Sequence, residues 1–303
     1  SLNTIDLAMK AKKCSVGKFH GTPKAIFIEL IKKWQVEKVI CNEDYEPYAT
    51  NRDAEIRGLL EREGVAFEMH KDQVVFAKDE IVKKDGSPYK VYTPFSRKWL
   101  ERFEENNLIS DESLPKINLT DLGFDKSIIE EPKYSFDNKV IDEYEETRNF
   151  PSLDSTSRLG SYLRFGIVSV RALVQKAASR SNNIFLKELI WREFFMQILW
   201  HFPHTSYKSF KPQYDKIEWL NNPADFEKWC KGDTGYPLVD AGMRQLNQTG
   251  FMHNRVRMLV GSFLCKHLLI DWRWGEAYFA EKLLDYEMSS NVGNWQWVAG
   301  CGV

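Results

Sequence analysis

The spacing of apolar residues predicts alternating helices and strands in the first third of the chain and helices thereafter. Residues 21–34 and 51–63 carry apolar side chains at helical spacing, whereas residues 36–43 and 65–70 are short runs rich in β-forming residues. Strands that alternate with helices predict a parallel sheet, so we expect a Rossmann-like α/β domain over residues 1–104. Because two strands alone make a poor sheet, we expect this domain to be partial.

The character of the sequence then changes twice. Residues 105–139 are polar and acidic and contain two prolines, which is typical of an interdomain linker. From residue 140 onward the pattern is helical, and segment 188–202 is apolar around most of its circumference, so it should be deeply buried. Further helices are expected over residues 223–232, 237–250, 251–269, 272–284 and 289–300. We therefore expect an all-α domain over residues 140–303.

Composition narrows the class of protein less than the patterns do. The chain has 42 basic and 43 acidic side chains and a net charge of −1, which neither supports nor excludes a nucleic-acid partner. No apolar run approaches the roughly 18 residues of a membrane helix, so we expect no membrane partner. The five cysteines are dispersed without a CxxC motif, which favours reduced thiols in the cytoplasm over disulfides or a zinc site. Cys301 is expected to be an ordinary free thiol that its place near the chain end can leave exposed.

Two polar clusters in the helical region are candidates for binding. Residues 155–166 place hydroxyl groups, an Arg and a Gly before a helix, which suits a phosphate, although such residues more often serve only as N-caps. Glu188, Trp191 and Arg192 share one helical face. They form either an internal ion pair beside a core Trp, or an acceptor and a stacking platform aimed into a cavity.

Two more clusters lie towards the end of the chain. Residues 254–258 contain an Asn, two Arg and a Met, which suits a phosphate backbone or a cofactor edge, or equally a solvated basic face. Residues 285–297 contain two carboxylates, an Asn and two Trp. Because a buried carboxylate needs a partner, we expect Asp285 to pair with a cation such as Arg257.

Six motifs in a fixed order carry a resemblance to a known family. They are TSRLG, ELIWREF, TGYPLVDAGMRQL, GFMHNRVRM, DWRWGEAYF and NVGNWQW. With DYEPYATNRD and KDGSPYKVYTPFSRKWLERF before them, they resemble the photolyase and cryptochrome family, and specifically its microbial cyclobutane-dimer photolyases. The resemblance covers the chain from about Val36 to Val303. It implies a partial antenna domain, a helical domain that holds FAD, and a lyase that uses light to split cyclobutane pyrimidine dimers in DNA.

The resemblance also implies how FAD, which the family binds in a U-shaped form, would be held. The positions that match those around its diphosphate and ribityl chain are Tyr144, Thr156, Ser157, Arg158 and Leu159. The positions that match those around its isoalloxazine ring are Asn254, Arg257, Asp285, Glu287 and Asn291. Among these, Asn291 matches the residue beside the flavin N5 atom.

A further set of residues matches positions that act on DNA or transfer electrons. Trp191 and Trp297 match the pair that flanks the flipped-out dimer, with Glu188 and Met258 at its edge. Arg148 and Arg255 match DNA-contacting positions. Trp295, Trp272 and Trp219 match the series of tryptophans that passes electrons to the flavin and reduces it in light. By this resemblance, excited reduced FAD donates an electron, the cyclobutane ring opens and the electron returns. Damaged DNA is the partner that these residues imply.

The sequence departs from the family pattern at three positions and at both ends. Phe251, where relatives often have Trp, is expected to be harmless. Glu287 stands where relatives often have Asp, and Gly160 stands where they often have Ser. Because the first antenna strands and the stretch after NWQWVAG are absent, we expect this chain to be a fragment, truncated at its C-terminus, of a monomeric parent. As a fragment it should bind FAD weakly and expose apolar surface near Trp295, Trp297 and Val298, which would promote self-association.

Two other activities and one cofactor stay open at this point. A cryptochrome-type light receptor without repair is the main alternative, although Trp191 and Asn291 argue against the plant type. A (6-4) photolyase carries a pair of active-site His residues, whereas only His253 lies in the corresponding motif here. A second, antenna chromophore could be a folate, a deazaflavin or none.

Overall fold

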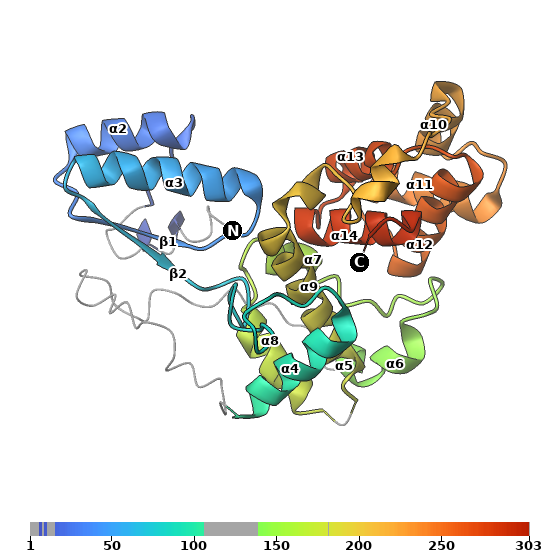
Figure 1. The fold of residues 1–303 in the computed structure, drawn as a ribbon, viewed down its shortest axis with the longest axis horizontal. Coiled ribbons are helices and arrows are strands. Elements are labelled where there is room, and N and C mark those ends of the chain that lie inside the picture. Colours follow the sequence, from blue (N-terminus) through green and yellow to red (C-terminus); the bar gives the residue numbers. More distant parts are fainter. Residues whose placement is uncertain (1–5, 8, 11–15, 106–138, 181, 303) are drawn as a thin grey trace.

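A computed structural model describes residues 6–7, 9–10, 16–105, 139–180 and 182–302 of the chain. An α/β lobe and a larger helical lobe are joined through the segment that follows strand β2 (Figure 1). This arrangement confirms the predicted class of an α/β unit followed by helices. The predicted linker at 105–139 falls almost entirely outside the described residues.

The α/β lobe is a two-stranded parallel sheet with two helices on one face (Figure 1). Its elements, in chain order, are α2 (Pro23–Lys33), β1 (Lys38–Asn42), α3 (Pro47–Arg62) and β2 (Ala66–His70). Lys38 pairs with Ala66 and Asn42 with His70, so the carboxyl ends of both strands meet at one edge. The buried residues Ile56, Leu60 and Val65 close the space between helices and sheet. This order of elements agrees with the predicted α/β alternation.

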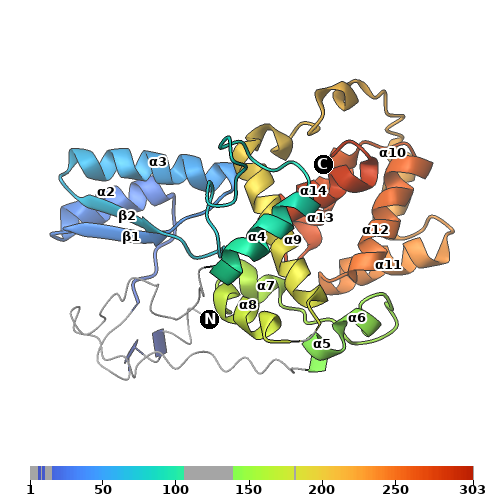
Figure 2. The ribbon, with the colours of Figure 1, turned by 60° about the horizontal axis from the view of Figure 1, so that its bottom comes forward.

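The helical lobe begins with α4 (Tyr92–Glu105), which lies across α9 (Ile184–His201) rather than on the sheet (Figure 2). Among the described residues between these two helices there are four short helices: α5 (Lys139–Asp142), α6 (Tyr144–Thr147), α7 (Gly160–Arg164) and α8 (Val170–Ala178). Two 3₁₀ turns, η3 (Pro203–Ser206) and η4 (Pro212–Lys216), follow α9. The rest consists of α10 (Pro223–Lys231), α11 (Pro237–Thr249), α12 (Asn254–Ser262), the turn η5 (Phe263–His267), α13 (Trp272–Lys282) and α14 (Met288–Ala299).

Most predicted helix ends agree with the structure, and one predicted helix is divided. Gly232 and Gly250 end α10 and α11 in the left-handed conformation that glycine adopts without strain. The single helix expected over 251–269 begins only at Asn254, and widens into a π turn at Phe263. The prediction that Cys301 can be exposed is wrong, because its side chain is buried against the core that contains Cys265. Among the described helices, none is both long enough and apolar enough to cross a membrane.

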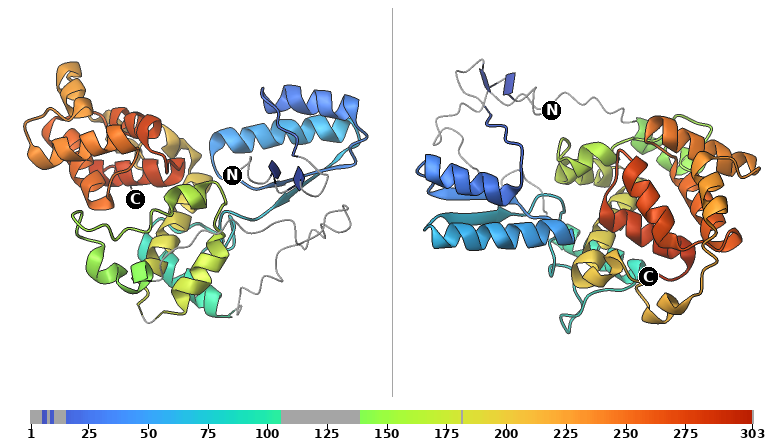
Figure 3. Two further views of the ribbon diagram at one scale, coloured as in Figure 1. Left: turned by 180° about the vertical axis from the view of Figure 1, so that it is seen from behind. Right: turned by 90° about the horizontal axis from the view of Figure 1, so that it is seen from above.

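The helical lobe contains two apolar cores. The helices after η4, drawn in orange to red in Figure 3, form the bundle that holds the second core. The first surrounds α9, which is buried on most of its circumference as its sequence predicted. The second lies among α10 to α14 and contains Trp229, Trp272 and Trp295. The abundance of Trp after residue 190 therefore serves packing in part.

Glu193, in the middle of α9, is a buried carboxylate that ties the two lobes together. Its Oε2 accepts the backbone N–H of Val75 at 2.8 Å, and its Oε1 accepts that of Phe76 at 3.1 Å. Oε1 also accepts the indole N–H of Trp99 on α4 at 2.7 Å. Burial raises the pKa of the Glu193 carboxyl to about 7, although these three donors favour its ionised form.

Because of this raised pKa, the difference in unfolding free energy between the wild type and Glu193→Gln should depend on pH. The unfolded chain ionises near the ordinary glutamate pKa of roughly 4.3, so the ionised form is less stable in the folded state. A carboxyl with a raised folded pKa stabilises the fold below the unfolded value and loses that contribution as pH rises towards the folded value. Relative to Glu193→Gln, the wild type should lose about 1–3 kcal/mol of unfolding free energy between pH 4.5 and 7. Urea unfolding at both pH values measures this, and a pH-independent difference would contradict it.

Candidate functional site

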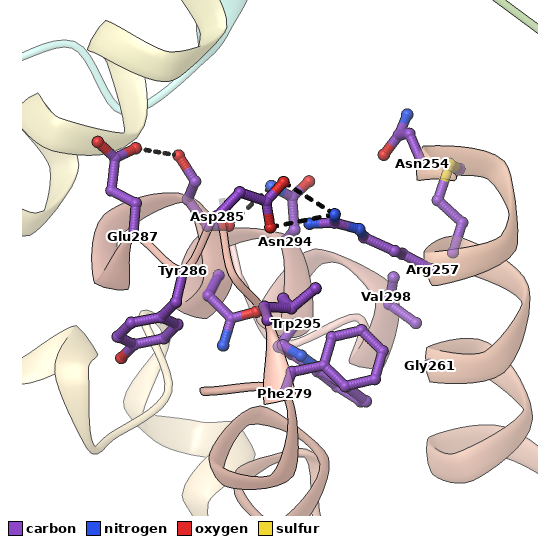
Figure 4. A pocket seen from close by; sticks show the side chains of 14 residues that line it. Asn254, Arg257, Gly261, Phe279, Asp285, Tyr286, Glu287, Asn294, Trp295 and Val298 are labelled. Atoms are coloured by element: carbon purple, nitrogen blue, oxygen red, sulfur yellow. Dashed lines mark hydrogen bonds and ion pairs between the residues drawn. The ribbon is translucent and has the colours of Figure 1, made fainter. Parts of the chain in front are cut away.

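A cavity of about 110 Å³ lies between α12 and α14 (Figure 4). All five residues predicted to surround an isoalloxazine ring line it: Asn254, Arg257, Asp285, Glu287 and Asn291. Trp295 and Phe279 form its apolar wall. The fold thus brings the start of α12, the start of α14 and the loop before α14 around one space.

Arg257 and Asp285 form the ion pair that the sequence predicted. The Nη2 atom of Arg257 lies 2.9 Å from Oδ2 and 3.2 Å from Oδ1 of Asp285. Its Nε donates to the carbonyl oxygen of Met252 at 2.8 Å, which fixes the plane of the guanidinium. A carboxylate and a cation are therefore held at the cavity edge in a fixed orientation.

Asn291 is oriented by a residue that the sequence analysis missed. Its Nδ2 donates to Oε1 of Glu276 at 2.9 Å and to the carbonyl oxygen of Glu276 at 3.2 Å. Burial raises the pKa of the Glu276 carboxyl. Because Nδ2 is engaged with Glu276, the amide oxygen of Asn291 is left to act as an acceptor. An acidic residue within the aromatic motif DWRWGEAYF was the available signal for this role.

The carboxylate of Glu287 is held from the opposite side by α9. Its Oε1 lies 2.9 Å from Nη2 of Arg192, and its Oε2 accepts the hydroxyl of Ser290 at 2.7 Å. Arg192 therefore pairs across helices and not with Glu188 on its own face. Glu188 pairs with Arg148, whose Nη1 lies 2.6 Å from its Oε1.

The segment predicted to hold the diphosphate lies next to this cavity, not in its lining. Thr156 and Ser157 are partly exposed, Arg158 has a left-handed φ of 51° and pairs with Asp154, and Leu159 is buried. Gly160 touches the cavity indirectly, because a Cβ atom added there would lie 2.9 Å from Oδ2 of Asp285. Tyr144 lies further away and packs edge to face on Phe185.

An adjoining cavity of about 320 Å³ collects the residues predicted to contact DNA. Its lining includes Arg148, Glu188, Trp191, Arg255, Met258 and Trp297. Four residues, Asn254, Met258, Ser290 and Asn294, line both cavities. A ligand in one cavity would therefore lie against a ligand in the other.

The two tryptophans of the larger cavity differ in their surroundings. Trp191 stacks on Tyr92 with ring centroids 3.6 Å apart and an interplanar angle of 5°. Trp297 is 52% exposed, whereas Trp295 and Val298 are buried. The prediction of a broad exposed apolar surface around these three residues is therefore wrong, because successive residues of α14 point to different faces.

The three tryptophans predicted to transfer electrons share the second core. Trp295 and Trp272 are buried, and Trp219 packs at the edge of the same cluster. Trp295 lies edge to face with Phe279 at 5.0 Å and with Trp229 at 6.2 Å. It also packs directly on Gly275, where an added Cβ would lie 2.2 Å from its ring.

A third and larger cavity, of about 850 Å³, lies at the carboxyl ends of the two strands. Asn42 lines it from the end of β1 and Gln73 from the segment after β2, whereas Arg164 of α7, Phe165 just after it and Arg171 of α8 line the other side. Arg171 pairs with Asp72 and donates to the carbonyl oxygen of Lys71. This cavity is thus both cationic and partly aromatic.

Comparison with known proteins finds matches over most of the chain. Residues 185–303 match the family model of the FAD binding domain of DNA photolyase, and residues 1–116 match that of DNA photolyase. The deoxyribodipyrimidine photo-lyase of Halobacterium salinarum is 36% identical over 321 residues, which cover 93% of this chain and 66% of that protein. The enzyme of the same name from Agrobacterium fabrum is 38% identical, with 93% of this chain and 66% of that protein covered. The chain thus spans just under two thirds of the length of these relatives.

Solved structures give the same result. A bacterial class III photolyase from Agrobacterium tumefaciens is 33% identical with a TM-score of 0.83, and the match covers 100% of this chain and 70% of that one. An archaeal photolyase from Sulfolobus tokodaii, described with two FAD molecules, is 32% identical with a TM-score of 0.77, covering 99% and 70%. A Synechocystis cryptochrome, 24% identical with a TM-score of 0.73, shares the fold over 93% of this chain and 66% of that one.

Gly160, which stands where relatives often have Ser, lies so close to Asp285 that a larger residue there should be destabilising. Gly160→Ala adds a Cβ atom 2.8 Å from Cβ of Asp285, so Asp285 must move and its ion pair with Arg257 is weakened. We expect an unfolding free energy lower by about 1–3 kcal/mol. Gly58→Ala is the control, because nothing lies within 4 Å of its added Cβ in the middle of α3 and a gain of roughly 0.5–1 kcal/mol is expected. Equal effects of the two substitutions in urea unfolding would contradict the prediction.

Proposed function

The chain belongs to the DNA photolyase family, and on this premise we propose that the protein is a deoxyribodipyrimidine photo-lyase that binds FAD and splits cyclobutane pyrimidine dimers in DNA with light. The observation that carries this proposal is the pair of adjoining cavities. One is lined by residues suited to a flavin, the other by two indoles and three Arg side chains, and they share part of their lining.

The residues around the smaller cavity fit FAD in their chemistry. The Arg257–Asp285 pair and the amides of Asn254 and Asn291 supply donors and acceptors for a flavin edge. The hydroxyl of Ser155 is buried and has no hydrogen-bond partner within the described chain, which suits a phosphate oxygen. The cavity of about 110 Å³ is small beside the roughly 300–1,000 Å³ of ligand pockets. A cavity of this size would take only part of the cofactor, and the rest would lie outside it.

The protein's own contribution is orientation and exclusion of water. Reduced FAD, when bound and excited by light, supplies the electron that opens the cyclobutane ring. Glu276 holds the amide of Asn291, and Arg257 holds Asp285, so both polar groups face the cavity in fixed orientations. The buried rings of Phe279 and Trp295 keep water from one side of the cavity, which strengthens the electrostatic contacts within it.

The larger cavity suits a flipped-out dimer. A dimer is poorly stacked in duplex DNA, so extruding it costs less than extruding an ordinary base pair; photolyases are themselves a standard example of base flipping. Trp191 and Trp297 offer apolar faces for its rings. Arg148 and Arg255 lie at the rim, where each can reach a phosphate. Arg148 also holds Glu188, so the carboxylate has a fixed place at the cavity edge.

The relatives favour this activity over the alternatives. Photolyases of both comparisons are 32–38% identical to the chain, whereas the cryptochrome at 24% supports only the fold. Light-dependent loss of dimers from an irradiated oligothymidine tests the proposal directly. A chain that binds dimer-containing DNA and FAD but removes no dimers in light would support the receptor alternative.

We also propose a division of labour along the chain. Residues 1–104 would form the antenna domain, although its last helix, α4, packs on α9 in the helical lobe; residues 105–139 would form the linker and 140–303 the catalytic FAD-binding domain. The third cavity is our candidate for an antenna chromophore, because ligands of open α/β sheets bind at the carboxyl ends of the strands. Its Arg residues would suit an anionic chromophore, and a folate and a deazaflavin both stay open.

The cellular setting and assembly are also inferred. The four described cysteines, Cys41, Cys230, Cys265 and Cys301, are free thiols. We infer a reducing compartment such as the cytoplasm, since disulfides are rare there. We further infer that the protein works as a monomer; self-association through the exposed Trp297 is the alternative that size-exclusion chromatography tests.

Trp191→Ala should weaken binding to dimer-containing DNA by roughly 1–3 kcal/mol, the usual value of one aromatic platform. Binding to undamaged DNA should change little, because phosphate contacts dominate it. Trp191→Phe, which keeps a ring over Tyr92, should lose less. Fluorescence anisotropy on irradiated and unirradiated oligothymidine measures both affinities, and equal losses on the two DNAs would refute the assignment of Trp191.

Trp219→Phe should block reduction of oxidised flavin by light while leaving repair by chemically reduced protein unchanged. Its indole lies at the edge of the core that buries Trp272 and Trp295, which suits the outer end of a relay. Absorbance of the flavin during illumination measures the first effect, and dimer loss after dithionite reduction measures the second. Loss of repair in the pre-reduced variant would instead make Trp219 a structural residue.

A further inference from the structure

Glu46 begins α3 in the α/β lobe, yet its side chain turns away from that helix. No side-chain cap is made to the α3 backbone. Instead, Oε1 of Glu46 accepts the backbone N–H of Met288 at 3.1 Å, across 242 positions of sequence. Its Oε2 lies 3.0 Å from Nη2 of Arg164 on α7. The side chain is only 14% exposed, so the carboxylate sits within the contact between the lobes.

Met288 is the first residue of α14, and the start of α14 lacks a cap of its own. Glu287 is its N-cap residue but makes no side-chain cap bond, and the first turn holds no acidic residue. The carboxylate of Glu287 is engaged by Arg192 and Ser290 instead. Within the described chain, Glu46 is the only side chain that accepts a hydrogen bond from the first-turn backbone of α14. Unpaired N–H groups at a helix start favour a carboxylate, through hydrogen bonding and through the helix dipole.

A second connection runs beside the first. Nη1 of Arg192 donates to the carbonyl oxygen of Gln73, in the segment after β2, at 2.7 Å. Nη2 of the same guanidinium lies 2.9 Å from Glu287. The beginning of α14 is thus linked to the α/β lobe directly by Glu46 and indirectly through Arg192. Both links converge one turn before Asn291 and within three turns of Trp297.

We propose that Glu46 is a positioning residue that caps α14 from the α/β lobe, and thereby sets where Asn291 and Trp297 lie in the two cavities. The docking of the α/β lobe and the geometry of the two cavities are then coupled through the carboxylate of Glu46. The part that concerns ligand binding rests on the function proposed above, whereas the capping itself does not.

Hydrogen–deuterium exchange of the full chain, without FAD, DNA or light, tests the capping. In Glu46→Ala, amides at the start of α14 should exchange roughly tenfold faster, because the cap is lost. Glu46→Gln keeps an amide oxygen that can accept the Met288 N–H, so exchange there should stay within about threefold of wild type. Glu55→Gln is the control, since Glu55 lies on the same helix and pairs with Lys24 at 2.6 Å, its one ionic partner among the described residues. It should leave α14 unchanged.

Binding to dimer-containing oligothymidine is the second measurement. Glu46→Ala should weaken it severalfold, Glu46→Gln should restore most of it, and affinity for undamaged DNA should not move. Unchanged α14 exchange in Glu46→Ala, equally fast exchange in the Ala and Gln variants, or faster exchange spread evenly over α3, α9 and α14 would each overturn the proposal. Wild-type protein that fails to discriminate dimers would overturn the proposed function instead, and the exchange result would still decide the role of Glu46.

Discussion

A buried carboxylate on α9 fixes the place of the segment that joins the two lobes. Glu193 is only 3% exposed and accepts three N–H donors, two from the backbone at Val75 and Phe76 and one from Trp99. Gln197, one turn later, donates to the carbonyl oxygen of Phe76 at 3.2 Å. A buried carboxylate that lost these donors would be strongly destabilising, so the three elements must be placed together. The joining segment, α4 and α9 therefore act as one framework.

Because α9 is fixed in this framework, the residues that it contributes to the site are fixed as well. Glu188, Trp191 and Arg192 lie within two turns of Glu193, so the same helix supplies the interlobe contact and the wall of the larger cavity. The approach of α14 is equally constrained, because a Cβ atom at Gly293 would lie 2.2 Å from the ring of Phe195. A helix that packs this closely cannot shift without opening the core. The cavities therefore depend on packing between α9 and α14 as much as on their polar lining.

Two carboxylates and two guanidinium groups, drawn from both lobes, surround the start of α14. Burial raises the pKa of the Glu46 carboxyl, and the nearby negative charges of Asp44 and Glu287 add to this shift. Arg164 and Arg192 offset this repulsion, at 3.0 Å and 2.9 Å from their respective partners. Partly buried ion pairs of this kind contribute orientation more than stability, since desolvation offsets much of the attraction. In this chain they orient the helix that bears Asn291 and Trp297.

The sequence by itself determined the periodic elements, the left-handed ends of α10 and α11, and the need of Asp285 for a partner. These follow from local rules of spacing, glycine conformation and charge burial, which act within a few residues or between residue types. The order of motifs also indicated which residues would gather around a flavin. The tertiary structure alone decided the partners: Arg192 pairs with Glu287 and not with Glu188, Asn291 with Glu276, and Met288 with Glu46. It also decided that Trp295 is buried while Trp297, two residues away, is exposed. Such choices depend on which helix faces meet, and contacts across more than two hundred positions leave no periodic signal in the chain.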